Sequence, residues 1–89
     1  MNENAFTIVD VRNPSEMKAG KLFTNALHIP LYELRERIDE IPVDKPIVVH
    51  CARGYRSAAG SSLIQARLNE SIQVFDLGAG VTSFEPKSD

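Results

Sequence analysis

The chain has few of the residues on which disulfide, metal and membrane proteins depend. Its 89 residues include one cysteine, Cys51, and two histidines, His28 and His50. A single cysteine excludes an internal disulfide, and these three side chains are too few for a four-ligand Cys/His zinc site, so we predict no metal. Apolar runs are short, as in residues 47–49, whereas a membrane-spanning helix needs roughly 18 to 20 consecutive apolar residues. We therefore expect no membrane span.

The chain also lacks a basic excess. Ten Lys plus Arg stand against twelve Asp plus Glu, for a net charge of −2, and this balance does not favour nucleic acid as a partner, because such proteins neutralise phosphates with basic side chains. The first residues are polar and do not form a secretory signal, so we expect a cytoplasmic protein. The length fits a single domain over residues 1–89, with a core at 5–84 and a frayed tail at 85–89.

Strand-like and helix-like segments alternate along the chain. Short runs rich in β-branched residues predict strands, and apolar residues spaced three and four apart predict helices. The expected strands are residues 6–11, 26–29, 47–51 and 72–77, and the expected helices are residues 14–19, 31–41 and 57–68. This alternation indicates an α/β sandwich with a mainly parallel sheet. Residues 47–51 form the most continuous apolar stretch, as expected for the central strand.

Cys51 ends the predicted central strand and faces the start of a helix. Ligands of open α/β sheets bind at the carboxyl ends of the strands, so this position favours function. Between Cys51 and Ser57 lies a tight turn in which Gly54 can take positive φ, and its backbone N–H groups can then converge on an anion. Arg53, Arg56 and the helix terminus add positive charge, so we expect a thiolate, with a pKa in the roughly 3.5 to 7.5 range of activated cysteines.

Two other interpretations of Cys51 compete with this one. A lone cysteine in a cytosolic protein is usually a small buried hydrophobe, and only the combination of strand end, glycine turn, two arginines and helix reverses that expectation. A Cys-His dyad is disfavoured, because neighbouring strand residues point to opposite faces and His50 therefore turns away from the thiol. Packing or hydrogen bonding is the expected role of both histidines.

The chain resembles a single-domain rhodanese module. The resemblance lies in Asp10-Val11-Arg12 followed by Glu16, in Ile29-Pro30, and above all in the loop Cys51-Ala52-Arg53-Gly54-Tyr55-Arg56-Ser57. It implies a three-layer α/β sulfurtransferase in which Cys51 carries a persulfide from thiosulfate or a small persulfide to a thiol or cyanide acceptor, without a cofactor. It also implies that the residues from Ala52 to Ser57 hold the persulfide or the anionic substrate.

The resemblance leaves several alternatives open. Asp10 and Arg12 match the family's strand-end pair, either as a structural ion pair or as substrate contacts. Arg53 either steers anionic donors or is an ordinary surface charge, and Tyr55 either lines the site or covers the surface. A loop of six residues from Cys51 to Arg56 is the sulfurtransferase length, whereas similar phosphatases have seven, so phosphatase or arsenate reductase chemistry is disfavoured.

Three departures from the family pattern shape the expectations. The usual histidine after the first helix is missing from residues 20–26, the closing glycines and aromatic appear as residues 78–80 and Phe84, and an opening strand and helix are absent. The late start suggests an excised module. The alternative function is therefore a weakly active or non-catalytic regulatory module, or a module that binds a partner, within a larger enzyme such as a metallo-β-lactamase-fold persulfide dioxygenase or a flavin disulfide reductase.

Overall fold

Four short strands form one sheet in the computed structural model, which describes residues 3–20, 23–52, 55–68 and 72–78. The strands are β1 (Thr7–Asp10), β2 (Leu27–His28), β3 (Ile47–His50) and β4 (Val74–Gly78), in the order β2-β1-β3-β4. All neighbouring strands run parallel. Val49 of β3 lies beside Val9 of β1 on one side and beside Asp76 of β4 on the other. The predicted parallel sheet is confirmed, with β3 between β1 and β4.

Three α-helices connect these strands. They are α1 (Pro14–Lys18), α2 (Leu31–Arg37) and α3 (Tyr55–Arg67), and 3-10 turns cover Glu3–Ala5 and Ile38–Glu40. The predicted helix at residues 31–41 thus ends in a tighter final turn, as is common before a proline. Helix α3 begins at Tyr55, two residues before the predicted start, so Tyr55 and Arg56 belong to the helix rather than to the loop. None of the described helices is long and apolar enough to cross a membrane.

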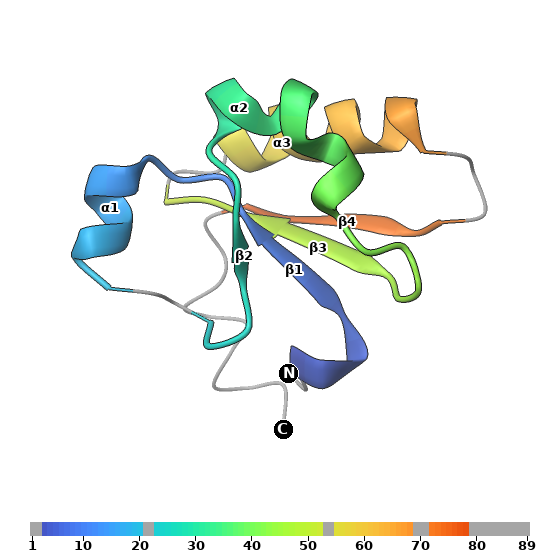
Figure 1. Cartoon of the computed structure of the whole chain (residues 1–89), viewed down its shortest axis with the longest axis horizontal. Helices are drawn as coiled ribbons and strands as arrows, with labels where there is room; N and C mark the ends of the chain where they lie inside the picture. Colours follow the sequence, from blue (N-terminus) through green and yellow to red (C-terminus); the bar gives the residue numbers. More distant parts are fainter. Residues whose placement is uncertain (1–2, 21–22, 53–54, 69–71, 79–89) are drawn as a thin grey trace.

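Helices α2 and α3 lie on the same side of the sheet (Figure 1). Leu34 of α2 and Ile64 of α3 pack against Val9 and Val49, and all four side chains are fully buried. Strand β3 is apolar on both faces because both are covered, which explains its unbroken apolar sequence. This larger cluster fixes the start of α3 against the end of β3, where Cys51 lies.

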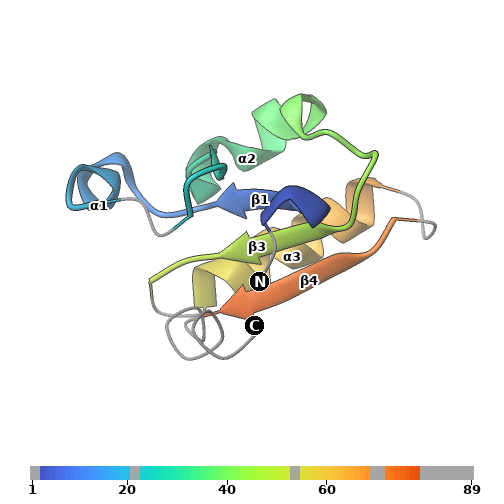
Figure 2. The ribbon, with the colours of Figure 1, turned by 90° about the horizontal axis from the view of Figure 1, so that it is seen from below.

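The opposite face of the sheet carries a smaller cluster. Ile8 and Val48 pack there with Phe23, whose side chain is 2% exposed. Phe23 belongs to the connection between α1 and β2, while the segment before β1 contributes Phe6, which meets Phe75 of β4 edge to face. Figure 2 shows β1, β3 and β4 side by side, with α3 behind them. The α/β fold class predicted from the sequence is confirmed, and the predicted tail lies outside the described residues.

Helix α1 starts at a capping box. The side chain of Glu16 accepts a hydrogen bond from the backbone N–H of Asn13 at 2.8 Å, and Pro14 occupies the first turn, where a missing N–H costs nothing. Gly20 follows the helix with φ of +136°, a conformation that favours glycine. The connection therefore leaves β1, makes one short helix and turns back toward β2.

Candidate active site

Cys51 is the first residue after β3, at the carboxyl end of the sheet. Its side chain is fully buried, and its Sγ accepts a hydrogen bond from the backbone N–H of Ser57 at 3.1 Å. Ser57 is the third residue of α3, and the first N–H groups of a helix have no partner within the helix. The positive end of the α3 dipole thus points at the sulfur, an arrangement that stabilises negative charge there.

Arg56 forms a two-pronged ion pair with Glu16 of α1. Its Nη1 and Nη2 donate to the two carboxylate oxygens at 2.5 and 2.8 Å. Hydrogen bonds from Arg56 and from the Asn13 backbone hold the pKa of Glu16 at about 2, and the same pairing raises the pKa of Arg56 above its ordinary value. The sequence predicts that the Arg56 charge stabilises the Cys51 thiolate, whereas in the structure Glu16 neutralises this guanidinium.

One donor of Arg56 is left over. Its Nε is buried and makes no hydrogen bond within the described part of the chain, while both terminal nitrogens are held by Glu16. An unpartnered buried N–H costs free energy unless a ligand or water satisfies it. Such a donor, next in sequence to Ser57, is suited to an anion at the site.

Asp10 and Arg12 form a second, more deeply buried pair. Arg12 Nε and Nη2 donate to the Asp10 carboxylate at 2.8 to 3.0 Å, and the Arg12 backbone N–H adds a further bond at 3.0 Å. Burial by itself raises the pKa of Asp10, but the bonds from Arg12 outweigh it and the net pKa is lowered. Arg12 Nη2 also donates to the Gly20 carbonyl and contacts Met17 Sδ. These bonds tie β1 to α1 and support the structural alternative for the pair.

His50 lies on the face of the sheet opposite Cys51. Its ring packs edge to face on Phe23, with centroids 5.0 Å apart, while Cys51 belongs to the cluster under α2 and α3. Its Nε2 is 3.7 Å from the Asp10 carboxylate, and neither ring nitrogen hydrogen-bonds to a residue that the structure describes. Burial lowers the pKa of His50, against the attraction of Asp10. The geometry agrees with the expectation that His50 is not the base for Cys51.

The structure brings part of the predicted site together. Cys51, Arg56 and Ser57 meet at the start of α3, Ala52 follows the thiol, and Tyr55 is 68% exposed at the surface. The Asp10 and Arg12 pair braces β1, and its bonds run to α1 rather than to the thiol. Arg53, Gly54, Ala79, Gly80 and Phe84 lie outside the described residues. The roles predicted for all these side chains stay predictions.

Glu16 is a residue of this region whose pairing with Arg56 the sequence does not predict. Two signals were available: the sequence Asn13-Pro14-Ser15-Glu16 is typical of a capping box, and it follows the strand next to β3. Because parallel strands end at one edge, a carboxylate in the first turn of α1 is brought to the edge that also holds the Cys51 loop.

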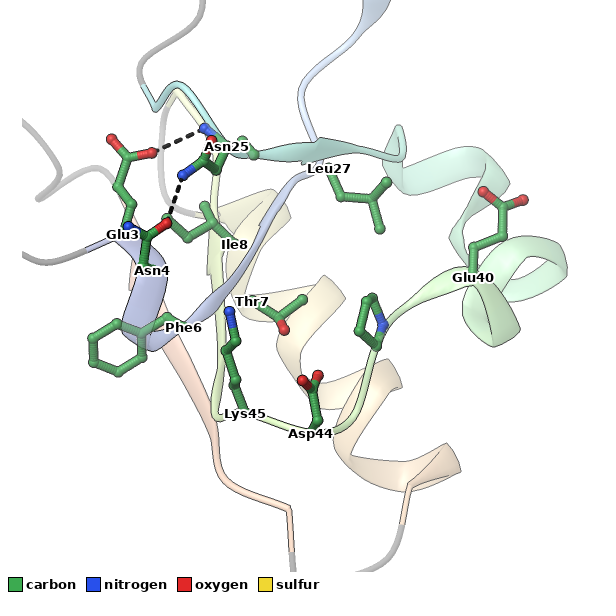
Figure 3. A pocket seen from close by; sticks show the side chains of 12 residues that line it. Glu3, Asn4, Phe6, Thr7, Ile8, Asn25, Leu27, Glu40, Asp44 and Lys45 are labelled. Atoms are coloured by element: carbon green, nitrogen blue, oxygen red, sulfur yellow. Dashed lines mark hydrogen bonds between the residues drawn. The ribbon is translucent and has the colours of Figure 1, made fainter.

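A hollow lies at the amino ends of the strands, at the other end of the sheet from Cys51. It has a volume of about 540 Å³, and Thr7, Leu27 and Lys45 are among the residues that line it (Figure 3). Asn25 closes one side through hydrogen bonds with Glu3 and Asn4. Since Cys51 stands at the carboxyl end of β3, this hollow is separate from the candidate active site.

The chain thus combines a parallel α/β sheet with a cysteine that lies between the central strand and the N-terminus of a helix. The profile of the rhodanese-like domain matches residues 1–85, and the chain belongs to this family. A rhodanese-related protein from Thermoplasma volcanium has a similar structure, with a TM-score of 0.79 and 34% identity, over 97% of this chain and 82% of that one.

Other relatives are longer proteins. The tRNA sulfurtransferase of Marinobacter nauticus is 35% identical over 71 residues, which cover 76% of this chain and 15% of that protein. The NAD-dependent persulfide reductase of A. fulgidus is similar in structure, with a TM-score of 0.67 and 37% identity, over 91% of this chain and 15% of that one. The chain spans 56% or less of the length of the curated relatives it matches.

Proposed function

We propose that this protein is a sulfurtransferase in which Cys51 carries a sulfane sulfur between a small donor and a thiophilic acceptor. The observation that carries the proposal is the hydrogen bond from the Ser57 N–H to Cys51 Sγ, made at the N-terminus of α3. Membership of the rhodanese-like family and the names of sulfurtransferase relatives support the same reaction class.

In the first half-reaction the Cys51 thiolate attacks the outer sulfur of thiosulfate. A bond forms between Cys51 Sγ and that sulfur, the sulfur–sulfur bond of thiosulfate breaks, and sulfite leaves with the bonding electron pair. The products are a Cys51 persulfide anion and sulfite, so the total charge is conserved. A small organic persulfide reacts in the same way and leaves as a thiolate.

In the second half-reaction an acceptor attacks the outer sulfur of the persulfide. With cyanide, thiocyanate forms, the persulfide bond breaks, and its electrons return to Cys51 as a thiolate. Negative charge stays near Cys51 throughout, and the donors for it are the Ser57 N–H and, for substrate oxygens, the unpartnered Arg56 Nε. Preorganised donors of this kind are worth about 3 to 4 kcal/mol each in comparable sites. Arg53 is assigned the steering of anionic donors.

Complete burial of Cys51 is also what an inert structural cysteine has. The two alternatives differ in reactivity, so mass spectrometry of the intact protein separates them. Wild type and Cys51→Ser are treated with thiosulfate or glutathione persulfide and measured before and after cyanide. We expect wild type alone to gain one sulfur atom, and cyanide to remove it as thiocyanate. A folded wild type that no donor modifies would contradict the proposal.

The disfavoured phosphatase alternative is tested with an aryl phosphate as substrate, whose hydrolysis is measured.

A second candidate is a regulatory or sulfur-relay module of a larger enzyme. It is favoured by structural similarity to parts of two reductases, the Bacillus anthracis CoADR-RHD and the A. fulgidus persulfide reductase, of which this chain covers 14% and 15%. In that role Cys51 exchanges sulfur with a neighbouring active site, and turnover of thiosulfate alone is slow. Both candidate functions include a location in the cytoplasm, which fractionation of cells tests.

A further inference from the structure

Strand β4 forms one edge of the sheet. On one side it pairs with β3, and on its outer side no strand of the described ranges pairs with it (Figure 2). The other edge strand, β2, has two residues, whereas β4 has five. A long open edge is a template for pairing with another chain, and proteins usually protect it with Lys, Pro or a cover. Strand β4 carries one charge, Asp76, and neither Lys nor Pro.

The backbone groups of Val74 and Asp76 point to the open side of β4. The Ile47 N–H donates to the Gln73 carbonyl at 2.8 Å, and Ile47 is the register partner of Val74. In a parallel pair this pattern directs the N–H and C=O groups of residues 73 and 75 toward β3, and those of residues 74 and 76 away from it. Val74 and Asp76 thus present two N–H and two C=O groups that no residue of the described ranges satisfies.

The side chains of β4 alternate between the two faces of the sheet. Val74 packs against the cluster under α2 and α3, whereas Phe75 meets Phe6 edge to face on the opposite side, with ring centroids 6.5 Å apart. Phe75 is nevertheless 46% exposed. A half-exposed ring beside an open strand edge is placed to contact a ring on an added strand, and such cross-strand aromatic pairs stabilise sheets.

We propose that β4 pairs antiparallel with β4 of a second copy, with Phe75 opposite Phe75 at the twofold axis. A twofold axis between antiparallel strands preserves the faces of the sheet, and directly opposite side chains share a face, so one residue must lie opposite itself. With Phe75 there, Val74 of each copy pairs with Asp76 of the other, and all the open backbone groups of both residues are used. Phe75 then occupies a non-hydrogen-bonded position, where opposite Cα atoms are about 4.5 Å apart and side chains are closest.

The neighbouring registers are less favourable. An axis beside Asp76 would place two carboxylates directly opposite each other, which destabilises a strand pair. An axis beside Val74 would pair Asp76 with Ile72, whose carbonyl already accepts a hydrogen bond from Gln65 Nε2 at 3.2 Å. The edge is therefore complementary to itself in one register, and this favours a second copy as the occupant.

The dimer is a continuous sheet in which the two copies run in opposite directions. Because Cys51 lies at the carboxyl end of β3, the two Cys51 sites stand at opposite ends of this sheet. One strand from each copy makes the contact, so the dimer belongs to the small interfaces that form weakly and depend on protein concentration.

A cross-linking experiment tests the register. Phe75→Cys and Gln73→Cys are each made in a Cys51→Ser background and oxidised with glutathione disulfide. Gln73 is the matched control, because it is exposed and lies on the same face of the strand. In the proposed register the Cα atoms of residue 75 lie within the range of about 4.4 to 6.8 Å that a disulfide needs, whereas those of residue 73 are about 14 Å apart. We expect Phe75→Cys to form a disulfide-linked dimer and Gln73→Cys to stay monomeric. Equal cross-linking of both variants would overturn the proposal.

Sedimentation equilibrium tests the dimer without cross-linking. Phe75→Lys is compared with Tyr32→Lys, which replaces another exposed aromatic, on α2, with the same change of charge. We expect Phe75→Lys to raise the dimer dissociation constant at least about tenfold, because two ammonium groups face each other, and Tyr32→Lys to leave it unchanged. Equal effects of the two substitutions would contradict the proposal, as would a wild type that stays monomeric up to about 1 mM.

Amide hydrogen exchange distinguishes a second copy from a segment of the same chain. We expect the amides of Val74 and Asp76 to become more protected as the protein concentration rises. Protection that is the same at every concentration would overturn the dimer and assign the edge to a segment of the same chain.

Discussion

Arg56, one residue before the amide that binds the Cys51 sulfur, is held by Glu16, which precedes it by 40 positions. The pair joins the first turn of α1 to the first turn of α3. The side chain of Glu16 is 29% exposed and that of Arg56 is 11% exposed, so water screens the pair only in part. Because both terminal nitrogens of Arg56 bind Glu16, its Nε has a fixed direction. We therefore predict that Glu16 positions Arg56 for the proposed reaction.

Replacing Glu16 by Gln should weaken this positioning. The neutral amide cannot accept both guanidinium bonds as strongly, so Arg56 gains freedom and its Nε no longer has a fixed direction. We expect both KM and kcat for thiosulfate to change, so that kcat/KM falls about tenfold. We also expect the free energy of unfolding to fall by about 1 kcal/mol. Steady-state kinetics and urea denaturation provide the two measurements.

Glu33→Gln is the matched control for that experiment. Glu33 also accepts a bond from an arginine, Arg37, at 2.8 Å, but on α2 and with a side chain 37% exposed. A small stability loss without any change in kcat/KM is expected. If both variants lose activity alike, the effect of Glu16 on catalysis is a general effect of stability.

The buried imidazole of His50 makes stability depend on pH. Burial lowers its pKa in the folded state, so below the ordinary value of about 6.5 the unfolded chain binds more protons than the folded one. The stabilising contribution of the neutral ring is complete above pH 6.5 and is lost as the pH falls below it. Each unit of pKa difference corresponds to about 1.4 kcal/mol. Urea denaturation between pH 5 and 8 should show this loss.

His50→Phe separates this effect from those of the carboxylates. Phenylalanine keeps a ring against Phe23 but cannot take up a proton, so its stability should stay flat between pH 5 and 6.5. The lowered pKa values of Asp10 and Glu16 affect stability at lower pH, below about 4.5. A wild type as flat as the variant from pH 8 to 5 would show that His50 does not titrate in this way.

Arg12→Lys should destabilise the fold far more than its conservative appearance suggests. Lysine cannot make the forked contact with Asp10 or reach Gly20 at the same time, and the carboxylate of Asp10 is fully buried. Breaking a buried pair usually costs about 3 to 5 kcal/mol. Arg37→Lys, in an exposed network on α2, should destabilise the fold much less, because water screens that network. Thermal unfolding compares the two, and equal losses would contradict the structural role of Arg12.

The fold was predictable because its signals are local. The apolar sequence of β3 reflects burial on both faces, and the strand-helix alternation dictates parallel pairing through right-handed connections. The same logic placed Cys51 at a strand end before a helix and turned His50 away from it. In each case the pattern of a few neighbouring residues determines the result.

The partners of the charged side chains were not predictable in the same way. The pairing of Arg56 with Glu16 depends on where α1 rests against the sheet, and no periodicity in the sequence encodes that position. The sequence also gave no sign that α3 would include Tyr55, because helix ends vary by a residue or two with local packing. The sequence therefore predicts Arg56 as a free positive charge near Cys51, whereas Glu16 neutralises it.

Gly60 in the middle of α3 offers a test of the packing between helix and sheet. A Cβ at this position would lie 3.4 Å from the nearest methyls of Val11 and Val49 and 3.5 Å from Leu34, which are ordinary contact distances. Gly60→Ala should therefore stabilise the protein by about 0.5 to 1 kcal/mol, because alanine favours the helix and fits without displacement. Gly60→Val adds two methyls to a filled space and should destabilise by about 1 to 3 kcal/mol. Urea denaturation decides: a loss of stability in Gly60→Ala would mean that α3 packs on β1 and β3 more closely than these distances indicate.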